Sequence, residues 1–431
     1  MPKVEPVLLK HVGVEGSTTF DYYQSHGGYE VARKALTSMK PEEVTEIVKG
    51  SGLRGRGGAG FPCGMKWTFV PKDSPKPKYL VVNADESEPG TFKDRVLIEN
   101  DPHALIEGII LAAYAIGSHT SYIYIRGEFG HPYRVFKRAV EEAYDRGALG
   151  KGALSSKWDL DLFIHRGAGA YICGEETALL SSIEGKRGYP KIKPPFPAVE
   201  GLFRCPTIVN NVETLMMVPH IVKNGAAWLK QWGTEKSPGL KVFGVSGHVK
   251  RPGLYELPLG IPVRELIFEH AGGIRDGHTF KGVIPGGASS GVLTEKELDT
   301  KLDFDTLGAM GMILGTAGAI VMDETVCMVD ALWNLLRFFH HESCGQCTPC
   351  REGTGWLDKM VARIERGEGR KEYIDMMLEV AQIVRPVMFC ALADAAAIPT
   401  KQFITRFRPE FERHIEAKGC PLRQEAVAAR P

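Results

Sequence analysis

The chain has 431 residues, of which 43% are hydrophobic, and its 53 basic and 52 acidic side chains leave a formal net charge of +1. This balance gives no long-range field that would gather nucleic acid or an anionic membrane surface, so charge implies neither partner. The length allows about two to four domains, no apolar run reaches the roughly 20 residues that cross a bilayer, and nine cysteines without a signal peptide at residues 1–16 indicate a reducing compartment.

The first half of the chain alternates helix and strand patterns. Pro41–Lys49 places Val44, Ile47 and Val48 at the spacing of one helix face, and the glycines that follow end this helix. Further on, short apolar strands alternate with amphipathic helices: strand 79–83, helix 103–116, strand 121–125, helix 132–144 and strand 160–164. Alternating strands and helices predict an α/β sheet with helices on both faces.

The pattern changes twice in the second half. After a Pro-rich stretch at 190–206, a β-rich segment begins near residue 241, with hairpin signals at Pro252-Gly253 and Gly286-Gly287 and one predicted helix at 263–270. From residue 324 the pattern is helical, over 325–341, 356–366, 372–384 and 391–414. We therefore predict three segments: an α/β segment with a helical N-terminal part (1–240), a small α+β segment (241–323) and an all-α helical bundle (324–431).

Four cysteines near the C-terminus have the spacing of metal ligands. Cys344, Cys347 and Cys350 form a CxxCxxC run, and Cys390 follows from a separate predicted element. Three closely spaced thiolates and a remote fourth suit one 4Fe–4S cluster, in which each iron needs a sulfur ligand. Zinc is the first alternative, although four-cysteine zinc sites typically use two separated pairs. Cys350 and Cys390 each precede a predicted helix start, whose N–H groups would stabilise an anionic cluster. The other cysteines considered are predicted not to be ligands: Cys173, Cys205, Cys327 and Cys420.

Two glycine-rich loops suggest phosphate binding. The first, at 52–61, contains a formal GxGxxG match, but it follows a predicted helix rather than a strand, so the dinucleotide fingerprint is weak. We interpret it instead as a loop whose backbone approaches a flat ligand and wraps phosphate, aided by Arg54, Arg56 or Lys66. A flexible connector is the alternative.

The second glycine-rich loop, at 167–177, follows a predicted strand and leads into a helix. This is the context in which phosphate binds at a helix N-terminus. Glu175 and Glu176 in the first helical turn alternatively complement the helix dipole.

An acidic loop at 83–90 follows another predicted strand, where open α/β sheets place their ligands. Its carboxylates, Asp85, Glu86 and Glu88, suit Mg²⁺. Alternatively they accept hydrogen bonds from ribityl and ribose hydroxyls and repel a 2′-phosphate, which predicts NADH over NADPH. Asn210 and Asn211 supply neutral polar groups at a further strand end.

Five motifs, in order along nearly the whole chain, resemble a single family; they lie at 55–67, 83–94, 169–178, 209–214 and 342–353. The family is the NADH- and FMN-binding flavoprotein subunit of respiratory complex I, the 51-kDa type. The resemblance implies a Rossmann-like α/β FMN domain, a ubiquitin-like SLBB domain and a helical 4Fe–4S domain for the three predicted segments.

The resemblance also implies roles for individual residues. Phe61 and Phe69 would surround the adenine of NADH, a role that suits aromatic stacking, although a Phe taken alone is more often part of a core. Glu86, Glu88 and Glu176 would bind polar groups of the dinucleotide. FMN would lie against Gly55, Gly57, Lys66, Asn83, Asp85, Tyr171, Gly174, Glu175, Asn210 and Asn211, and the 4Fe–4S cluster would be bound by Cys344, Cys347, Cys350 and Cys390.

Two positions depart from the family pattern. Cys63 stands where the family often has Thr, and Ala393 stands where Gly is common. Neither departure removes a ligand, and a buried free Cys63 is expected to be inert.

The implied reaction is hydride transfer from NADH to flavin N5, followed by one-electron steps to the cluster and on towards quinone. Because the flavin performs this chemistry, no side chain need act as acid or base. Expected partners are a thioredoxin-like 2Fe–2S subunit (24-kDa type) and a large multi-cluster Fe–S subunit (75-kDa type), at a cytoplasmic location peripheral to the inner face of the cell membrane. One alternative is a diaphorase subunit of an NAD-linked hydrogenase or formate dehydrogenase, many of which carry an extra domain. Another is a zinc-stabilised nucleotide-binding scaffold without redox chemistry.

Overall fold

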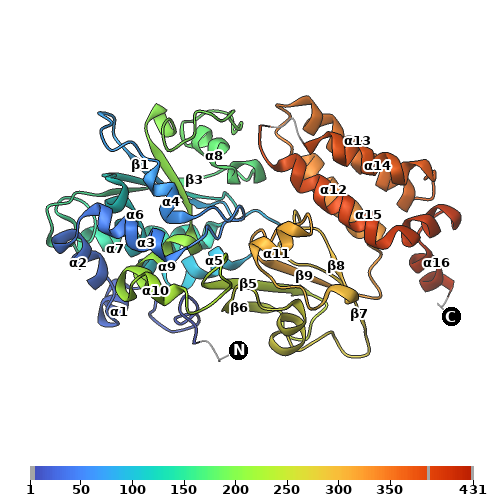
Figure 1. Ribbon diagram of the computed structural model, residues 1–431, viewed down its shortest axis with the longest axis horizontal. Coiled ribbons are helices and arrows are strands. Elements are labelled where there is room, and N and C mark those ends of the chain that lie inside the picture. The colour runs from blue at the N-terminus through green and yellow to red at the C-terminus, as the bar shows by residue number, and fades with distance from the viewer. Residues whose placement is uncertain (1–4, 386–388, 429–431) are drawn as a thin grey trace. The chain divides into compact units, whose positions relative to one another are not determined.

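The computed structural model describes residues 5–385 and 389–428, and the chain divides into two compact units (Figure 1). The first unit runs to Ser87 and also includes residues 92–243 and 254–261. The second comprises residues 88–91 and 244–253 and the chain from Pro262 onward.

A four-stranded parallel sheet forms the centre of the first unit. Its strand order is β3-β2-β1-β4, from β1 (Tyr79–Ala84), β2 (Thr120–Ile125), β3 (Asp161–Arg166) and β4 (Thr207–Asn211). In β1 the side chains of Leu80, Val81 and Val82 are all fully buried, as expected for a strand covered on both faces. The predicted α/β sheet is therefore confirmed.

The helices α6 (Pro102–Ile116), α7 (Gly130–Asp145) and α9 (Val212–Asn224) accompany this sheet. The sequence sets the ends of α6, because Asp101 accepts a hydrogen bond from the backbone N–H of Ala104, Pro102 occupies the first turn and Gly117 adopts a left-handed conformation at the end. Smaller helices complete the unit: α1 (Phe20–Ser25), α2 (Glu30–Ser38), α3 (Pro41–Ser51), α4 (Cys63–Thr68), α5 (Lys93–Asn100), η1 (Ala153–Ser155), η2 (Tyr171–Gly174), α8 (Glu176–Ile183), η3 (Leu202–Arg204) and α10 (Ala226–Leu229).

A second, mixed sheet follows in the chain, with the order β6-β5-β9-β7-β8. Its strands are β5 (Leu240–Gly247), β6 (Gly253–Pro258), β7 (Phe280–Ile284), β8 (Leu293–Thr294) and β9 (Gly318–Asp323). β9 runs parallel to β5 and antiparallel to β7. Short helices lie between the strands: η4 (Glu265–His270), η5 (Glu295–Glu297) and α11 (Phe304–Ala309).

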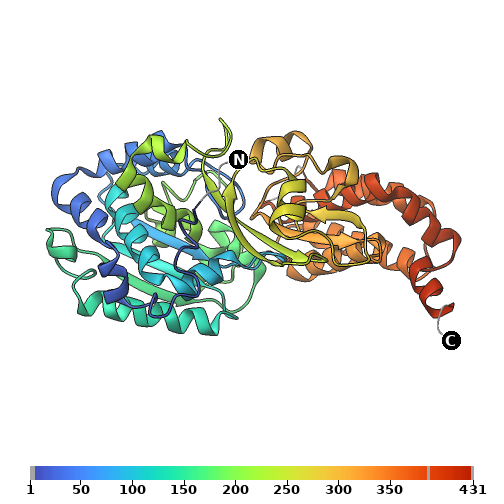
Figure 2. The ribbon, with the colours of Figure 1, turned by 90° about the horizontal axis from the view of Figure 1, so that it is seen from below.

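The C-terminal part of the second unit is helical, and Figures 1 and 2 show its longer helices packed side by side. The helices are α12 (Met328–Glu342), α13 (Thr348–Glu365), α14 (Glu372–Ile383), α15 (Leu392–Glu416) and α16 (Pro421–Ala428). Across the described ranges of the chain, no helix combines the length and the apolar character needed to cross a membrane.

The predicted start of α13 at Trp356 is wrong, because the helix begins eight positions earlier, at Thr348. Two glycines, Gly353 and Gly355, lie in the part of the helix that was not predicted. The structure explains Gly353 by close packing: a Cβ there would lie 2.3 Å from Cγ1 of Val384, so the helix keeps a glycine where a neighbouring segment approaches it. Cys350 therefore lies inside the first turn of α13 rather than before it.

Candidate functional site

The strand order of the first sheet brings the predicted ligand loops to one edge. The chain passes from β1 through β2 to β3 on one side and then returns to β4 on the other side of β1. In open α/β sheets, ligands bind at the carboxyl ends of the strands at such a switch point. Asn83 at the end of β1 pairs in register with Asn211 at the end of β4, so the acidic loop and the Asn210-Asn211 pair meet there.

The first glycine loop packs against the end of β4. A Cβ on Gly57 would lie 2.9 Å from Cβ of Asn211, so the close approach requires glycine at this position. The backbone N–H of Arg56 donates to Oγ1 of Thr214 at 2.8 Å. These contacts fix the loop on the sheet edge, which argues against a flexible connector.

The two arginines of this loop support the loop itself. Arg54 Nε donates to the carbonyl of Gly60 at 2.7 Å, and Arg56 Nη2 donates to that of Pro238 at 3.1 Å. Arg56 is 1% exposed, and burial lowers its pKa to about 10. Among the three cations predicted to assist phosphate binding, Arg56 therefore has a structural position in the core.

Lys66 lies at the site beside a carboxylate. Its Nζ is 2.7 Å from Oε2 of Glu176 and donates to the carbonyl of Val209 at 3.0 Å. Lys193 approaches the other oxygen of Glu176 at 2.8 Å and Glu175 at 3.1 Å. Burial raises the pKa of Glu176, but the two ammonium groups outweigh it and lower the pKa to about 2. Lys193 was missed in the sequence because no motif marks it; only the Pro-rich composition around it was noticed.

The second glycine loop ends in a self-capped helix. Glu175 accepts hydrogen bonds from the N–H groups of Thr177 at 2.8 Å and Ala178 at 2.9 Å, at the start of α8. This arrangement favours the helix-dipole interpretation of Glu175, because its own carboxylate occupies these donors. The loop is tied to β1, since Nδ2 of Asn83 donates to the carbonyl of Gly174 at 2.8 Å.

The carboxylates of the acidic loop each have a different partner. Asp85 accepts a hydrogen bond from the Ser87 hydroxyl at 2.6 Å. Glu86 accepts from the N–H groups of Asp94 at 2.8 Å and Arg95 at 3.0 Å, at the start of α5. Burial, together with the Asp94 charge, raises the pKa of Glu86 to about 7. Separate partners favour hydrogen bonding by these carboxylates over a shared Mg²⁺ site.

Glu88 belongs to the second unit. Its Oε1 accepts hydrogen bonds from the backbone N–H of Ser289 at 2.7 Å and from the Ser289 hydroxyl at 2.6 Å. In this structure Glu88 therefore orders the turn after β7, and its predicted contact with NADH stays a prediction.

Two aromatic side chains lie exposed near the first glycine loop. Phe61 is 45% exposed and Phe69 is 50% exposed. Their ring centroids are 6.0 Å apart at an interplanar angle of 53°. An exposed aromatic pair is not an ordinary core pair, and its faces suit stacking against a flat ligand such as adenine.

A buried ion network lies next to Asn211 and was not predicted. Asn211 Nδ2 donates to Asp94 at 2.7 Å, and Lys93 lies 2.7 Å from Asp94 and 2.9 Å from Glu213. Lys241 lies 2.5 Å from Glu213, and both side chains are fully buried. The presence of Glu213 inside the 209–214 motif was the only signal that the sequence offered for this network.

The four cysteines of the quartet lie at two helix starts of the second unit. Cys347 is the residue before α13, Cys350 lies in its first turn, and Cys390 precedes α15 by two positions. Burial, with a smaller effect of the neighbouring Cys347 and Cys344, raises the pKa of Cys350 to about 11. A hydrogen bond with the Ser343 hydroxyl acts in the opposite direction and lowers this pKa. Three adjacent thiols and a fourth at a second helix start fit an iron–sulfur cluster, whose iron would bind them as thiolates.

Comparison with known proteins matches three regions of the chain to known families. Residues 48–220 match the Nuo51 FMN-binding domain, 242–293 the SLBB domain and 330–414 the NADH-ubiquinone oxidoreductase-F iron–sulfur binding region. The F 2 subunit of NADH-quinone oxidoreductase of Rhizobium meliloti (strain 1021) is 54% identical over 97% of this chain and 99% of its own. The chain belongs to the family of NADH-quinone oxidoreductase F subunits. The F subunit of Mycobacterium tuberculosis (strain ATCC 25618 / H37Rv) is 52% identical over 97% of this chain and 95% of its own.

A solved structure of an NAD+-reducing NiFe hydrogenase in the H2-reduced state also shares the fold, with a TM-score of 0.82 and 35% identity. The match covers 97% of this chain and 67% of the hydrogenase chain. The predicted combination of a parallel α/β FMN-binding domain, an SLBB domain and a helical 4Fe–4S region is thus confirmed for this member of the F-subunit family.

Proposed function

We propose that this relative of the F subunits binds FMN and NADH at the carboxyl edge of its first sheet and passes electrons to a cluster bound by Cys344, Cys347, Cys350 and Cys390. The observation that carries the proposal is the switch point between β1 and β4, with the first glycine loop packed over it. FMN, when bound, supplies the exchange between two-electron and one-electron chemistry.

The residues of this edge bind and orient the flavin. The Asn side chains offer neutral donors and acceptors, and Lys66 supplies a positive charge next to the glycine loop, where a phosphate group would be held. The proposed FMN residues are Gly55, Gly57, Lys66, Asn83, Asp85, Tyr171, Gly174, Glu175, Asn210 and Asn211.

The nucleotide site is proposed to use the exposed aromatic pair and nearby carboxylates. Phe61 and Phe69 would stack on adenine, while Glu86, Glu88 and Glu176 would contact polar groups of NADH. A negatively charged loop at 83–90 opposes a 2′-phosphate, so NADH is the proposed substrate in preference to NADPH.

The F subunits are, by name, parts of a larger oxidoreductase, and the electrons require a further acceptor. The proposed partners are a thioredoxin-like 2Fe–2S subunit and a large multi-cluster Fe–S subunit that lead towards quinone. The proposed location is cytoplasmic, at the inner face of the membrane through this complex.

A diaphorase subunit of an NAD-linked hydrogenase is the second candidate, because the fold matches such a hydrogenase over nearly the whole chain. A formate dehydrogenase subunit belongs to the same class. Identity of 54% to a quinone oxidoreductase subunit against 35% to the hydrogenase favours the first candidate.

The test is anaerobic reduction of the purified full chain, followed by optical and EPR spectra. NADH should bleach a bound flavin and produce the EPR signal of a reduced 4Fe–4S cluster, whereas NADPH at equal concentration should do so much more slowly. A flavin that bleaches without a cluster signal would contradict the proposed electron path. A colourless protein without flavin or iron would instead support a non-redox scaffold.

A further inference from the structure

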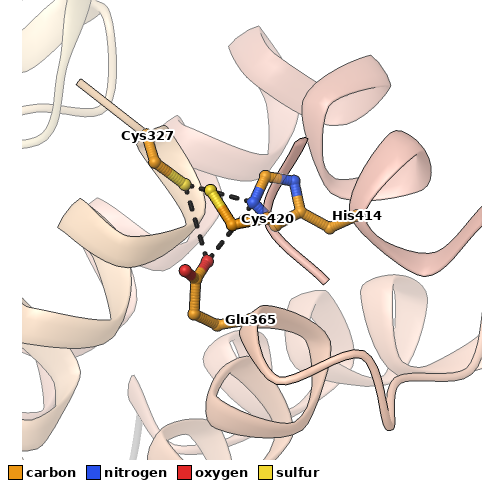
Figure 3. A group of neighbouring side chains, drawn as sticks. All are labelled: Cys327, Glu365, His414 and Cys420. Carbon is orange, nitrogen blue, oxygen red and sulfur yellow. Dashed lines mark hydrogen bonds and ion pairs between the residues drawn. The ribbon is translucent and has the colours of Figure 1, made fainter. Parts of the chain in front are cut away.

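A second group of metal-ligand residues lies in the helical region, apart from the cysteine quartet. Cys327, Glu365, His414 and Cys420 are each less than 10% exposed, and one ligand atom from each lies within 4.8 Å of the others. Figure 3 shows the four side chains pointing toward one another. We propose that these residues bind one structural zinc ion. Cys327 and Cys420 were predicted not to be ligands, and the structure supports the opposite assignment.

Three of the distances between ligand atoms are close to those of a tetrahedral zinc site. Sγ of Cys327 lies 3.2 Å from Nε2 of His414 and 3.5 Å from Oε2 of Glu365, and Nε2 and Oε2 lie 3.3 Å apart. Zinc binds sulfur at about 2.3 Å and nitrogen or oxygen at about 2.0–2.2 Å, so neighbouring ligand atoms of a tetrahedron are about 3.3–3.8 Å apart. The ligand atoms of Cys327, Glu365 and His414 are therefore spaced nearly as a zinc ion requires, and Sγ of Cys420 lies within 4.8 Å of each of them.

Hydrogen bonds from neighbouring backbone groups orient two of the proposed ligands, His414 and Cys327. Nδ1 of His414 lies 2.8 Å from the carbonyl of Glu410 and donates to it, which leaves the lone pair of Nε2 facing the cluster. The backbone N–H of Asp330 donates to Sγ of Cys327 at 3.3 Å, a contact that stabilises a thiolate.

Ligand chemistry and charge select zinc. Two thiolates, one imidazole and one carboxylate form a closed set of four, which is typical of structural zinc and leaves no position for a substrate. With zinc bound, the four ligands retain one negative charge. Nη1 of Arg423 lies 3.4 Å from Oε1 of Glu365 and its Nη2 lies 3.0 Å from Asp330, so this arginine places a positive charge beside the site.

A zinc ion at the proposed site would link four helices. Cys327 precedes α12, Glu365 ends α13, His414 lies in the last turn of α15, and Cys420 precedes α16. The quartet lies at the opposite end of α13, and 18 helical residues at about 1.5 Å each separate the two ends by roughly 27 Å. The two metal centres would therefore be distinct and would hold the same helices from both ends.

Metal content and X-ray absorption of the purified full chain test the proposal. After incubation with zinc and desalting, we expect about one zinc per chain, with an absorption spectrum of two sulfur and two nitrogen or oxygen ligands. A spectrum of four sulfur ligands would place the zinc in the quartet and overturn the proposal. Absence of retained zinc would overturn it as well, and the four side chains would then form a hydrogen-bonded group or a Cys327–Cys420 disulfide.

Substitutions locate the ion. Cys420→Ser should lower zinc affinity at least tenfold with iron content retained, whereas Cys205→Ser, a buried cysteine of the first unit, should change neither. Glu365→Gln keeps the side-chain volume and is the substitute test variant if Cys420→Ser does not fold. It should also weaken zinc binding at least tenfold. Unchanged zinc affinity in a folded Cys420→Ser or Glu365→Gln variant would disprove the assignment.

Discussion

At Glu176 a single carboxylate joins two lysines that are far apart in the sequence. Lys66 and Lys193 each lie within 3 Å of one of its oxygens. The partly buried position makes this pairing stronger than a surface ion pair, and the two ammonium groups lower the pKa of Glu176. Glu176, which is proposed to contact NADH, thus also positions Lys66, which is proposed to contact FMN.

Glu176→Gln should raise the KM for NADH by roughly tenfold, which corresponds to about 1.4 kcal/mol of binding free energy. FMN content should change little, because Lys66 keeps its hydrogen bond to the Val209 carbonyl. Steady-state kinetics and flavin quantification check this. Glu184→Gln is the matched control, since Glu184 also pairs with two lysines, Lys186 and Lys191, at the other end of α8. Equal loss of FMN and of NADH affinity in Glu176→Gln would contradict the assignment.

At the scale of single elements, the sequence predicts helices and strands with a clear apolar pattern, such as the amphipathic α3 and the buried apolar runs of α6 and β1. It missed α5, whose start is set by the Glu86 carboxylate on the N–H groups of Asp94 and Arg95. It also misplaced the start of α13, where Gly353 is required because Val384 packs closely against it. Short motifs predicted the loops of the site, but side-chain pairings between distant segments, such as Lys193 with Glu176, leave no local pattern to read.

The buried network around Glu213 should be the most sensitive link between elements of the first unit. Glu213→Gln leaves Lys241 and Lys93 without a full countercharge in the core, so we expect a loss of about 3–5 kcal/mol in the free energy of unfolding. Chemical denaturation at pH 7 measures this. Glu235→Gln, at an exposed position, should stay within about 0.5 kcal/mol of the unchanged protein.

The same network predicts a pH dependence. Burial raises the pKa of Glu213, but Lys241, Lys93 and Arg56 lower it from an ordinary 4.5 to about 2. A carboxylate with a lowered folded pKa stabilises the fold above its unfolded pKa and loses that effect as pH falls through the folded value. Stability should therefore fall between about pH 4.5 and 2, and the fall should be smaller in Glu213→Gln. If the free energy of unfolding fell equally with pH in both proteins, Glu213 would not be a cause of the loss of stability in acid.

At the scale of the whole molecule, the flavin-site residues assigned to the first unit and the cysteine quartet belong to different compact units. The matched family regions, 48–220 and 330–414, likewise separate the two chemistries. We therefore expect that the chain can lose one proposed redox centre and keep the other. The proposed zinc would add a third, non-redox centre that maintains the helices α12, α13 and α15 when the cluster is absent.

Cys390→Ala tests this independence directly. The variant should lose the 4Fe–4S cluster, because one of its four proposed iron ligands is missing. NADH should still bleach the flavin at a rate within about twofold of the unchanged protein, since no proposed flavin-site residue is altered. Iron content and EPR measure the first effect, and anaerobic stopped-flow absorbance measures the second. Cys205→Ala, a buried cysteine outside both centres, should retain both signals. If Cys390→Ala also abolished flavin bleaching, the cluster would be needed to form the nucleotide site, and the two units would have to fold as one.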